Sequence, residues 1–141
     1  MPVRSVCEGT MRSRETLLRL HRFRTEEKRR QVADIDSMIQ DFMRKFDELD
    51  AQVKFEESRT GVSDPTHFNY SMTAKAARSR RDNLMKSIAE LRDQMADAQT
   101  ALGEEEQELR RAELLVEKES GASHAISSSV HAAGAMQVRP A

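Results

Sequence analysis

The chain has 141 residues, of which 38% are hydrophobic and 33% are charged, and it contains no Trp and one Tyr. This balance favours long helices and excludes a thick globular core. With a net charge of −1, the chain as a whole has no electrostatic preference for nucleic acid or for an anionic membrane.

The first predicted element is a helix over residues 14–59. Residues 1–13 show no hydrophobic period and end in Ser13, a residue type that caps helix N-termini well. No Pro or Gly interrupts the chain from there to Arg59, so a single helix can run through the segment. We expect residues 1–13 to form a flexible leader ahead of it.

A loop then separates this helix from a second one. Gly61 suits the end of a helix, and Asp64 followed by Pro65 favours a turn, which together predict a loop over residues 60–71. The chain after this loop is again free of Pro for a long stretch, so a second helix is predicted over residues 72–118.

The last segment, residues 119–141, is rich in Ser, Ala and Gly and has almost no charge and no hydrophobic period. It is therefore predicted to be a disordered tail. No apolar run approaches the roughly 20 residues of a membrane span. The single Cys7 cannot form a disulfide within the chain, so a cytoplasmic location is expected.

Both predicted helices carry apolar residues at alternating steps of three and four, which is the spacing of seam positions in a coiled coil. So narrow a stripe has room for one or two partner helices but not for a globular core. The predicted seam consists of Val32, Ile35, Ile39, Phe42, Phe46, Leu49, Val53, Leu84, Ile88, Leu91, Met95 and Leu102.

The two helices have similar lengths and a short connection, so within one chain they can pair only in antiparallel orientation. Positions whose numbers sum to 130 then face one another, as Phe42 does with Ile88. The acidic end of the first helix lies beside the basic start of the second, and the signs are exchanged at the other end, which disfavours parallel homodimers. We therefore predict an all-α fold, an antiparallel coiled-coil hairpin over residues 14–118.

The pattern fails at the end of the hairpin that holds the helix termini. The same rule places Thr25 opposite Glu105 and His21 opposite Leu109, so we expect a poorly closed seam there. Apolar residues also collect off the seam among arginines, and we interpret them as a docking surface for a partner, with frayed ends and a local register shift as the alternative. These residues are Leu17, Leu20 and Phe23 on the first helix and Leu114 and Leu115 on the second.

The sequence contains no pattern that indicates catalysis or metal binding. The four histidines lack metal-ligand spacing, and the carboxylates belong to solvated helix faces where no pocket would exclude water. We therefore expect no catalytic residue, no cofactor and no metal site. The basic run over residues 27–30, together with RLHRFR at residues 19–24, could contact phosphates, but we expect these basic side chains to pair with the acidic end of the second helix, so nucleic acid is not an expected partner.

Three segments in order, MRSRETLLRLHRFRTEEKRRQVADID, GVSDPTHFNY and ARSRRDNL, resemble the FliJ family of flagellar export proteins over residues 11–118. The resemblance implies a non-enzymatic component of the bacterial flagellar type III protein export apparatus, built like the central stalk of rotary ATPases. Its implied partners are the export ATPase, the cytoplasmic domain of the export gate and the substrate-specific export chaperones. The implied location is the cytoplasmic face of the membrane, without direct insertion.

Transferred to this sequence, the resemblance assigns an ATPase-facing end that coincides with the docking surface. That end comprises Leu17, Leu20, Phe23, Arg24, Lys28, Leu109 and Leu114. Near the loop the sequence departs from better-known family members, with Ala, Lys and Arg after Tyr70, so no gate-contacting residue is transferred. The alternative function is a generic coiled-coil scaffold or a regulatory adaptor of another cytosolic assembly.

Overall fold

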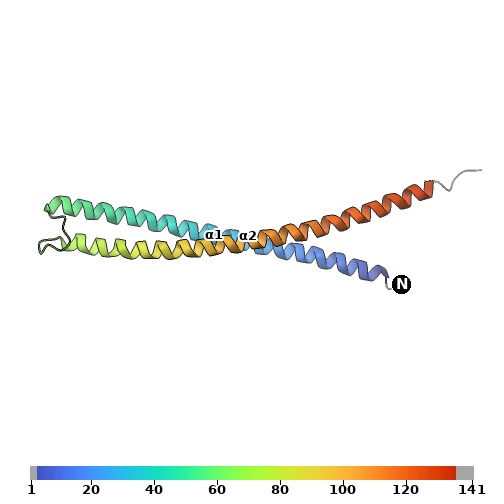
Figure 1. Ribbon diagram of the computed structural model, residues 1–141, viewed down its shortest axis with the longest axis horizontal. Coiled ribbons are helices and arrows are strands. Elements are labelled where there is room, and N and C mark those ends of the chain that lie inside the picture. The colour runs from blue at the N-terminus through green and yellow to red at the C-terminus, as the bar shows by residue number, and fades with distance from the viewer. Residues whose placement is uncertain (1–2, 136–141) are drawn as a thin grey trace, which may run out of the picture. The chain divides into compact units, whose positions relative to one another are not determined.

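The computed structural model of the chain consists of two α-helices, α1 (Val3–Thr60) and α2 (Met72–Ala135), joined by a loop (Figure 1). It describes the backbone of residues 3–135 and the side chains of residues 12–121. Within the described backbone there is no strand. The predicted fold class, an all-α antiparallel coiled-coil hairpin of two long helices, is confirmed.

Both described helices extend beyond the ends predicted for them. α1 begins at Val3 instead of residue 14, and α2 ends at Ala135 instead of residue 118. Adding a residue to an existing helix costs far less than nucleating one, so the Ser-rich, Ala-rich and Gly-containing flanks do not stop a helix in the absence of Pro. Residues 136–141 of the predicted disordered tail lie outside the described residues.

The chain divides into two compact units. We call Arg29–Ala101 the hairpin unit, because it contains the loop and the adjoining parts of both helices. We call Met1–Lys28 together with Leu102–Ala141 the terminal unit, which contains the N-terminal part of α1 and the C-terminal part of α2.

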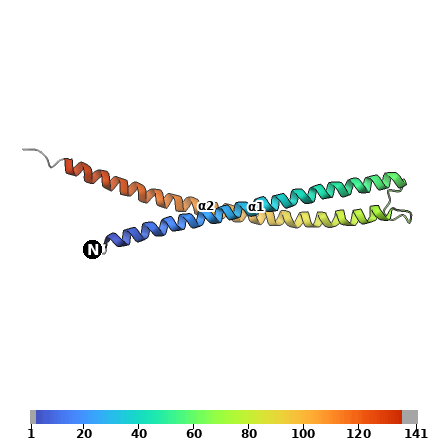
Figure 2. The ribbon, with the colours of Figure 1, turned by 180° about the vertical axis from the view of Figure 1, so that it is seen from behind.

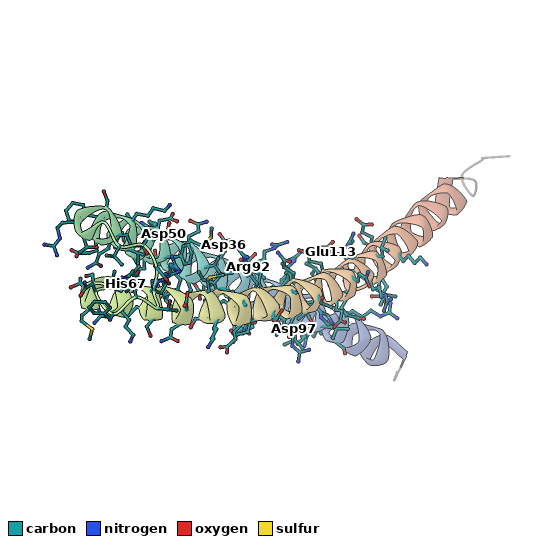
Figure 3. The ribbon with its side chains drawn as sticks, turned by 60° about the vertical axis from the view of Figure 1, so that its left-hand side comes forward. Asp36, Asp50, His67, Arg92, Asp97 and Glu113 are labelled. Atoms are coloured by element: carbon teal, nitrogen blue, oxygen red, sulfur yellow. The ribbon has the colours of Figure 1, made fainter. Side chains whose placement is uncertain are left out.

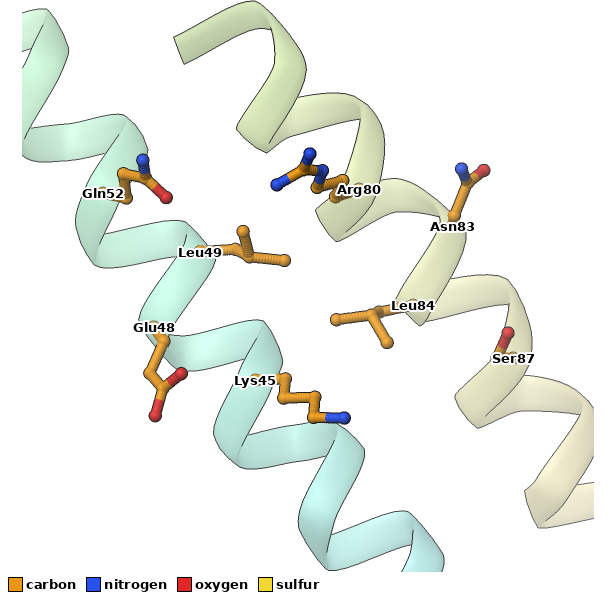
Figure 4. A pocket seen from close by; sticks show the side chains of 8 residues that line it. All are labelled: Lys45, Glu48, Leu49, Gln52, Arg80, Asn83, Leu84 and Ser87. Carbon is orange, nitrogen blue, oxygen red and sulfur yellow. The ribbon is translucent and has the colours of Figure 1, made fainter. Parts of the chain in front are cut away.

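The core of the hairpin unit is a single seam between α1 and α2, which lie side by side there in both views (Figures 1 and 2). None of the residues predicted for its seam is exposed. Leu49 and Leu84 point toward one another from the facing helices (Figure 4). Fully burying one Leu or Ile contributes about 1.5–3 kcal/mol, so the stability of this thin core depends on few side chains. Within α1 and α2 of this unit, the most deeply buried residues are Ile39, Val53, Ala74, Ala77, Ile88 and Leu91.

The loop ties the last turn of α1 to the first turn of α2. Gly61 adopts a φ of 72°, which a residue without a Cβ tolerates, and its N–H donates to the carbonyl of Glu57 at 2.9 Å. The Ser71 hydroxyl accepts a hydrogen bond from the N–H of Ala74 at 3.3 Å and so caps α2. Tyr70 is buried, and its hydroxyl donates to Glu57 Oε1 at 2.7 Å. Burial, and then the neighbouring Glu57, raise the pKa of Tyr70.

The seam of the terminal unit contains polar groups that satisfy one another. Leu18 and Ala112 are buried on facing helices. His21 Nδ1 lies 2.7 Å from Glu105 Oε1, and the hydroxyl of Thr25, 1% exposed, donates to the His21 carbonyl at 2.7 Å. The expectation of a poorly closed seam is therefore wrong for these residues. A polar layer closes a seam when its hydrogen-bonding groups have partners.

Carboxylates of the hairpin unit pair with cations near the loop. Asp50, labelled in Figure 3, binds Lys54 at 3.0 Å and the guanidinium of Arg81 at 2.8 Å, and these two cations lower the pKa of Asp50. Arg81 interrupts the apolar seam, and this ion pair explains how it fits there. Arg59 likewise lowers the pKa of Glu56.

Acidification is expected to destabilise the hairpin unit. The pKa of Asp50 is lower in the folded than in the unfolded chain. The contribution of Asp50 to the free energy of unfolding is therefore fully present above its unfolded pKa of about 4, and it is lost as the pH falls through its folded pKa. The midpoint of urea unfolding, followed by circular dichroism, should therefore be lower at about pH 3 than at about pH 7. In Asp50→Asn this difference should shrink, and an unchanged difference would contradict the assigned role of Asp50.

Candidate functional site

The terminal unit exposes an apolar surface on α1. Leu17, Leu20 and Phe23 are 42%, 41% and 60% exposed, whereas Leu18 is 8% exposed. Leu17 and Leu20 are three residues apart and therefore adjacent on the helix, while Leu18 is rotated by about 100° toward α2. We call Leu17, Leu20 and Phe23 the α1 apolar surface. Single exposed apolar residues are common, whereas these three follow one another at helical spacing on one helix.

α2 adds further exposed leucines to the terminal unit. Leu114 and Leu115 are 57% and 44% exposed, next to the buried Ala112. Of the other residues assigned to the ATPase-facing end, Arg24 is exposed, whereas Lys28 and Leu109 are half-buried. Lys28 and Leu109 are therefore less accessible to a partner than the remaining members of the set.

Most arginines beside the α1 apolar surface do not pair with α2. Arg14 forms an ion pair with Glu119. Arg19, Arg22 and Arg24 are exposed and form no ion pair with any side chain that the structure describes. The predicted pairing of this basic segment with the acidic end of α2 is therefore realised only in part. The unpaired cations remain available to a partner with an acidic surface.

The chemistry that this arrangement supports is binding by apolar burial and charge. The hollows on the hairpin unit are open grooves, one of about 490 Å³ lying beside Leu49 and Leu84 (Figure 4). Among residues 12–121 no group of three His, Cys, Asp or Glu side chains could hold a metal ion. Neither described helix is long and apolar enough to cross a membrane.

Two buried residues and one groove were not among the predicted seam and site residues. Leu18 and Thr25 are buried, although the seam was expected to fail around them. The rule that facing positions sum to 130 pairs Leu18 with Ala112, so the signal was present in the sequence. The exposed Met43 and Met85, which line one groove of the hairpin unit, were not predicted from the sequence.

Compared with known protein families, curated proteins and solved structures, the chain gives no match. The three sequence segments quoted above and the exposed surface of the terminal unit are therefore the features that bear on its function.

Proposed function

We propose that the chain is a non-enzymatic component of the bacterial flagellar type III protein export apparatus, acting as a stalk and escort that binds the export ATPase. The observation that carries the proposal is the α1 apolar surface with its unpaired arginines. It lies at residues to which the FliJ resemblance assigns the ATPase contact. A pair of helices with open grooves suits a protein that regulates an ATPase and leaves hydrolysis to its partner.

Binding would combine apolar anchors with charge steering. Burying one Leu or Phe side chain in a partner pocket contributes about 1.5–3 kcal/mol, and aromatic residues and arginines are the commonest anchors of protein interfaces. Arg19, Arg22 and Arg24 would face acidic groups at the rim and raise the association rate. The expected partner surface is therefore an apolar pocket with an acidic rim.

The same proposal includes further partners and a location. The cytoplasmic domain of the export gate and the substrate-specific export chaperones are proposed partners, with no cofactor, no nucleic acid and no insertion into the membrane. The protein would be cytoplasmic and would reach the cytoplasmic face of the membrane through the export apparatus.

Direct binding measurements test this function. The full chain, immobilised at low density, is expected to bind the purified flagellar export ATPase and the cytoplasmic domain of the export gate. The catalytic hexamer of a rotary ATP synthase serves as the control for nonspecific insertion of a helical pair. If the chain binds neither export protein, the proposal fails and the alternative stands, a generic scaffold or regulatory adaptor of another assembly.

A further inference from the structure

Two exposed methionines of the hairpin unit line the same groove. Met43 on α1 and Met85 on α2 are 44% and 56% exposed. The groove, of about 350 Å³, has Phe46, Ile88 and Ala89 as its other apolar residues and is flanked by Asp47 on α1 and Arg92 on α2. We call it the methionine groove. Its apolar floor is continuous with the buried seam, since Ile88 is only 7% exposed.

The charges on the two rims of the methionine groove have opposite signs. Residues seven apart lie on the same face of a helix in a coiled coil. One heptad before and after Met43, the α1 rim carries Asp36 and Asp50. One heptad before and after Met85, the α2 rim carries Arg78 and Arg92. The α1 rim therefore reads acid, Met, acid, and the α2 rim reads Arg, Met, Arg.

We propose that a second copy of this chain packs on the methionine groove and forms a four-helix bundle with a two-fold axis parallel to the helices. Such an axis places α1 of each copy beside α2 of the other and keeps every residue at its own level along the bundle. Facing positions sum to about 130, so residue 94 of α2 lies at the same height along the bundle as Asp36 of α1. Arg92 is two residues from that position.

The other two layers match in the same way. Residue 87 of α2 lies at the same height as Met43, close to Met85. Residue 80 of α2 lies at the same height as Asp50, close to Arg78. Each copy thus brings an acidic rim against the basic rim of the other, with the methionines between them. Methionine suits such a contact because its unbranched side chain adapts to the facing surface.

The rim charges argue against the other symmetric arrangement. A two-fold axis perpendicular to the helices and centred at Met43 would set α1 against α1, with Asp36 of one copy beside Asp50 of the other. The arginines of α2 would meet one another in the same way, and like charges in contact oppose association. A foreign helix would have to carry both a basic and an acidic flank in register, which the chain's own helices already supply.

The layer of Asp36 and Arg92 is the most available of the charged layers. Arg92 forms no ion pair with any described side chain, and Asp36 accepts only a hydrogen bond from Gln40 at 3.0 Å. Asp50 and Arg78 already have partners within the chain, the latter with Glu57 at 3.7 Å. The first layer therefore provides the stronger test.

Sedimentation equilibrium of the full chain, from about 1 to 100 µM, is expected to show reversible dimers. Met85→Glu should raise the dissociation constant at least about tenfold, because it places carboxylates in the apolar centre of the interface. Met38→Glu is the matched control. Met38 is 46% exposed on α1 but lies five residues before Met43 and so faces the other side of the helix. A monomer throughout the range, or equal weakening by both variants, would overturn the proposal.

Charge exchange and crosslinking test the arrangement. Asp36→Arg and Arg92→Asp should each weaken the dimer, and the double variant should recover it. With Cys7→Ser in every chain, a mixture of Met43→Cys and Met85→Cys chains should form disulfide-linked dimers between the two kinds. Met43→Cys chains alone should crosslink poorly, because the α1 helices are diagonal in this bundle. Efficient crosslinking of Met43→Cys with itself, or no recovery in the double charge variant, would overturn the proposed axis.

Discussion

Replacing Leu17, Leu20 and Phe23 together by alanine is expected to remove most of the binding to the export ATPase while the hairpin stays folded. All three are at least 41% exposed, so their truncation opens no cavity in the seam. An anchor buried at an interface typically contributes about 2 kcal/mol or more, so the dissociation constant should rise at least about 30-fold. Helix content should be unchanged, and the melting midpoint should move by less than about 3 °C.

A matched control separates loss of a specific surface from loss of apolar area. Met38→Ala, Phe55→Ala and Met72→Ala remove three side chains of the hairpin unit that are 46%, 66% and 77% exposed. This second triple variant should bind the ATPase as the parent chain does. If the first triple variant melts early and still binds, its residues stabilise the fold and the docking site lies elsewhere.

Leu91→Ala is expected to lower the free energy of unfolding by about 3 kcal/mol. Leu91 is 7% exposed in the seam of the hairpin unit, and deleting a buried Leu side chain removes its transfer free energy and leaves a cavity. Phe42→Ala should cost less than a buried aromatic usually does. Phe42 is only half-buried, with Lys45 Nζ 5.8 Å from its ring centroid.

Urea unfolding followed by circular dichroism measures the effect of Leu91→Ala. Leu115→Ala makes the same chemical change in the same helix at a position that is 44% exposed, and it should cost less than about 1 kcal/mol. Equal losses in the two variants would mean that the seam around Leu91 does not hold the helices together.

The sequence was sufficient to predict the pairing of the helices, because heptad spacing and the sum of facing positions do not depend on side-chain detail. It also predicted the loop, since Gly61 is the residue that adopts a positive φ where α1 ends. The described helices run past the predicted ends, because a helix continues through weak helix formers until something stops it. The sequence contains no Pro between residues 3 and 64 and none between residues 66 and 139, so no Pro stops either helix at its distant end.

For the candidate site, the sequence located the apolar residues but not the pairing of the polar ones. Leu17, Leu20 and Phe23 were placed off the seam by their spacing alone. By contrast, counting apolar matches treats His21 and Glu105 as breaks, although their hydrogen bond closes the seam. The charge pattern of the sequence also predicted more arginine ion pairs than the structure contains among its described side chains. Exposed ion pairs contribute only about 0.2–1 kcal/mol and do not fix long side chains.

The side-chain contacts between the two helices close chain segments of very different lengths. The hydrogen bond of Tyr70 with Glu57 spans 13 residues of chain, that of Arg81 with Asp50 spans 31, and that of His21 with Glu105 spans 84. Closing a short segment loses less chain entropy than closing a long one, and each pair formed shortens the segment left to close for the next. We therefore expect the two helices to pair from the loop outward during folding, with the terminal unit pairing last.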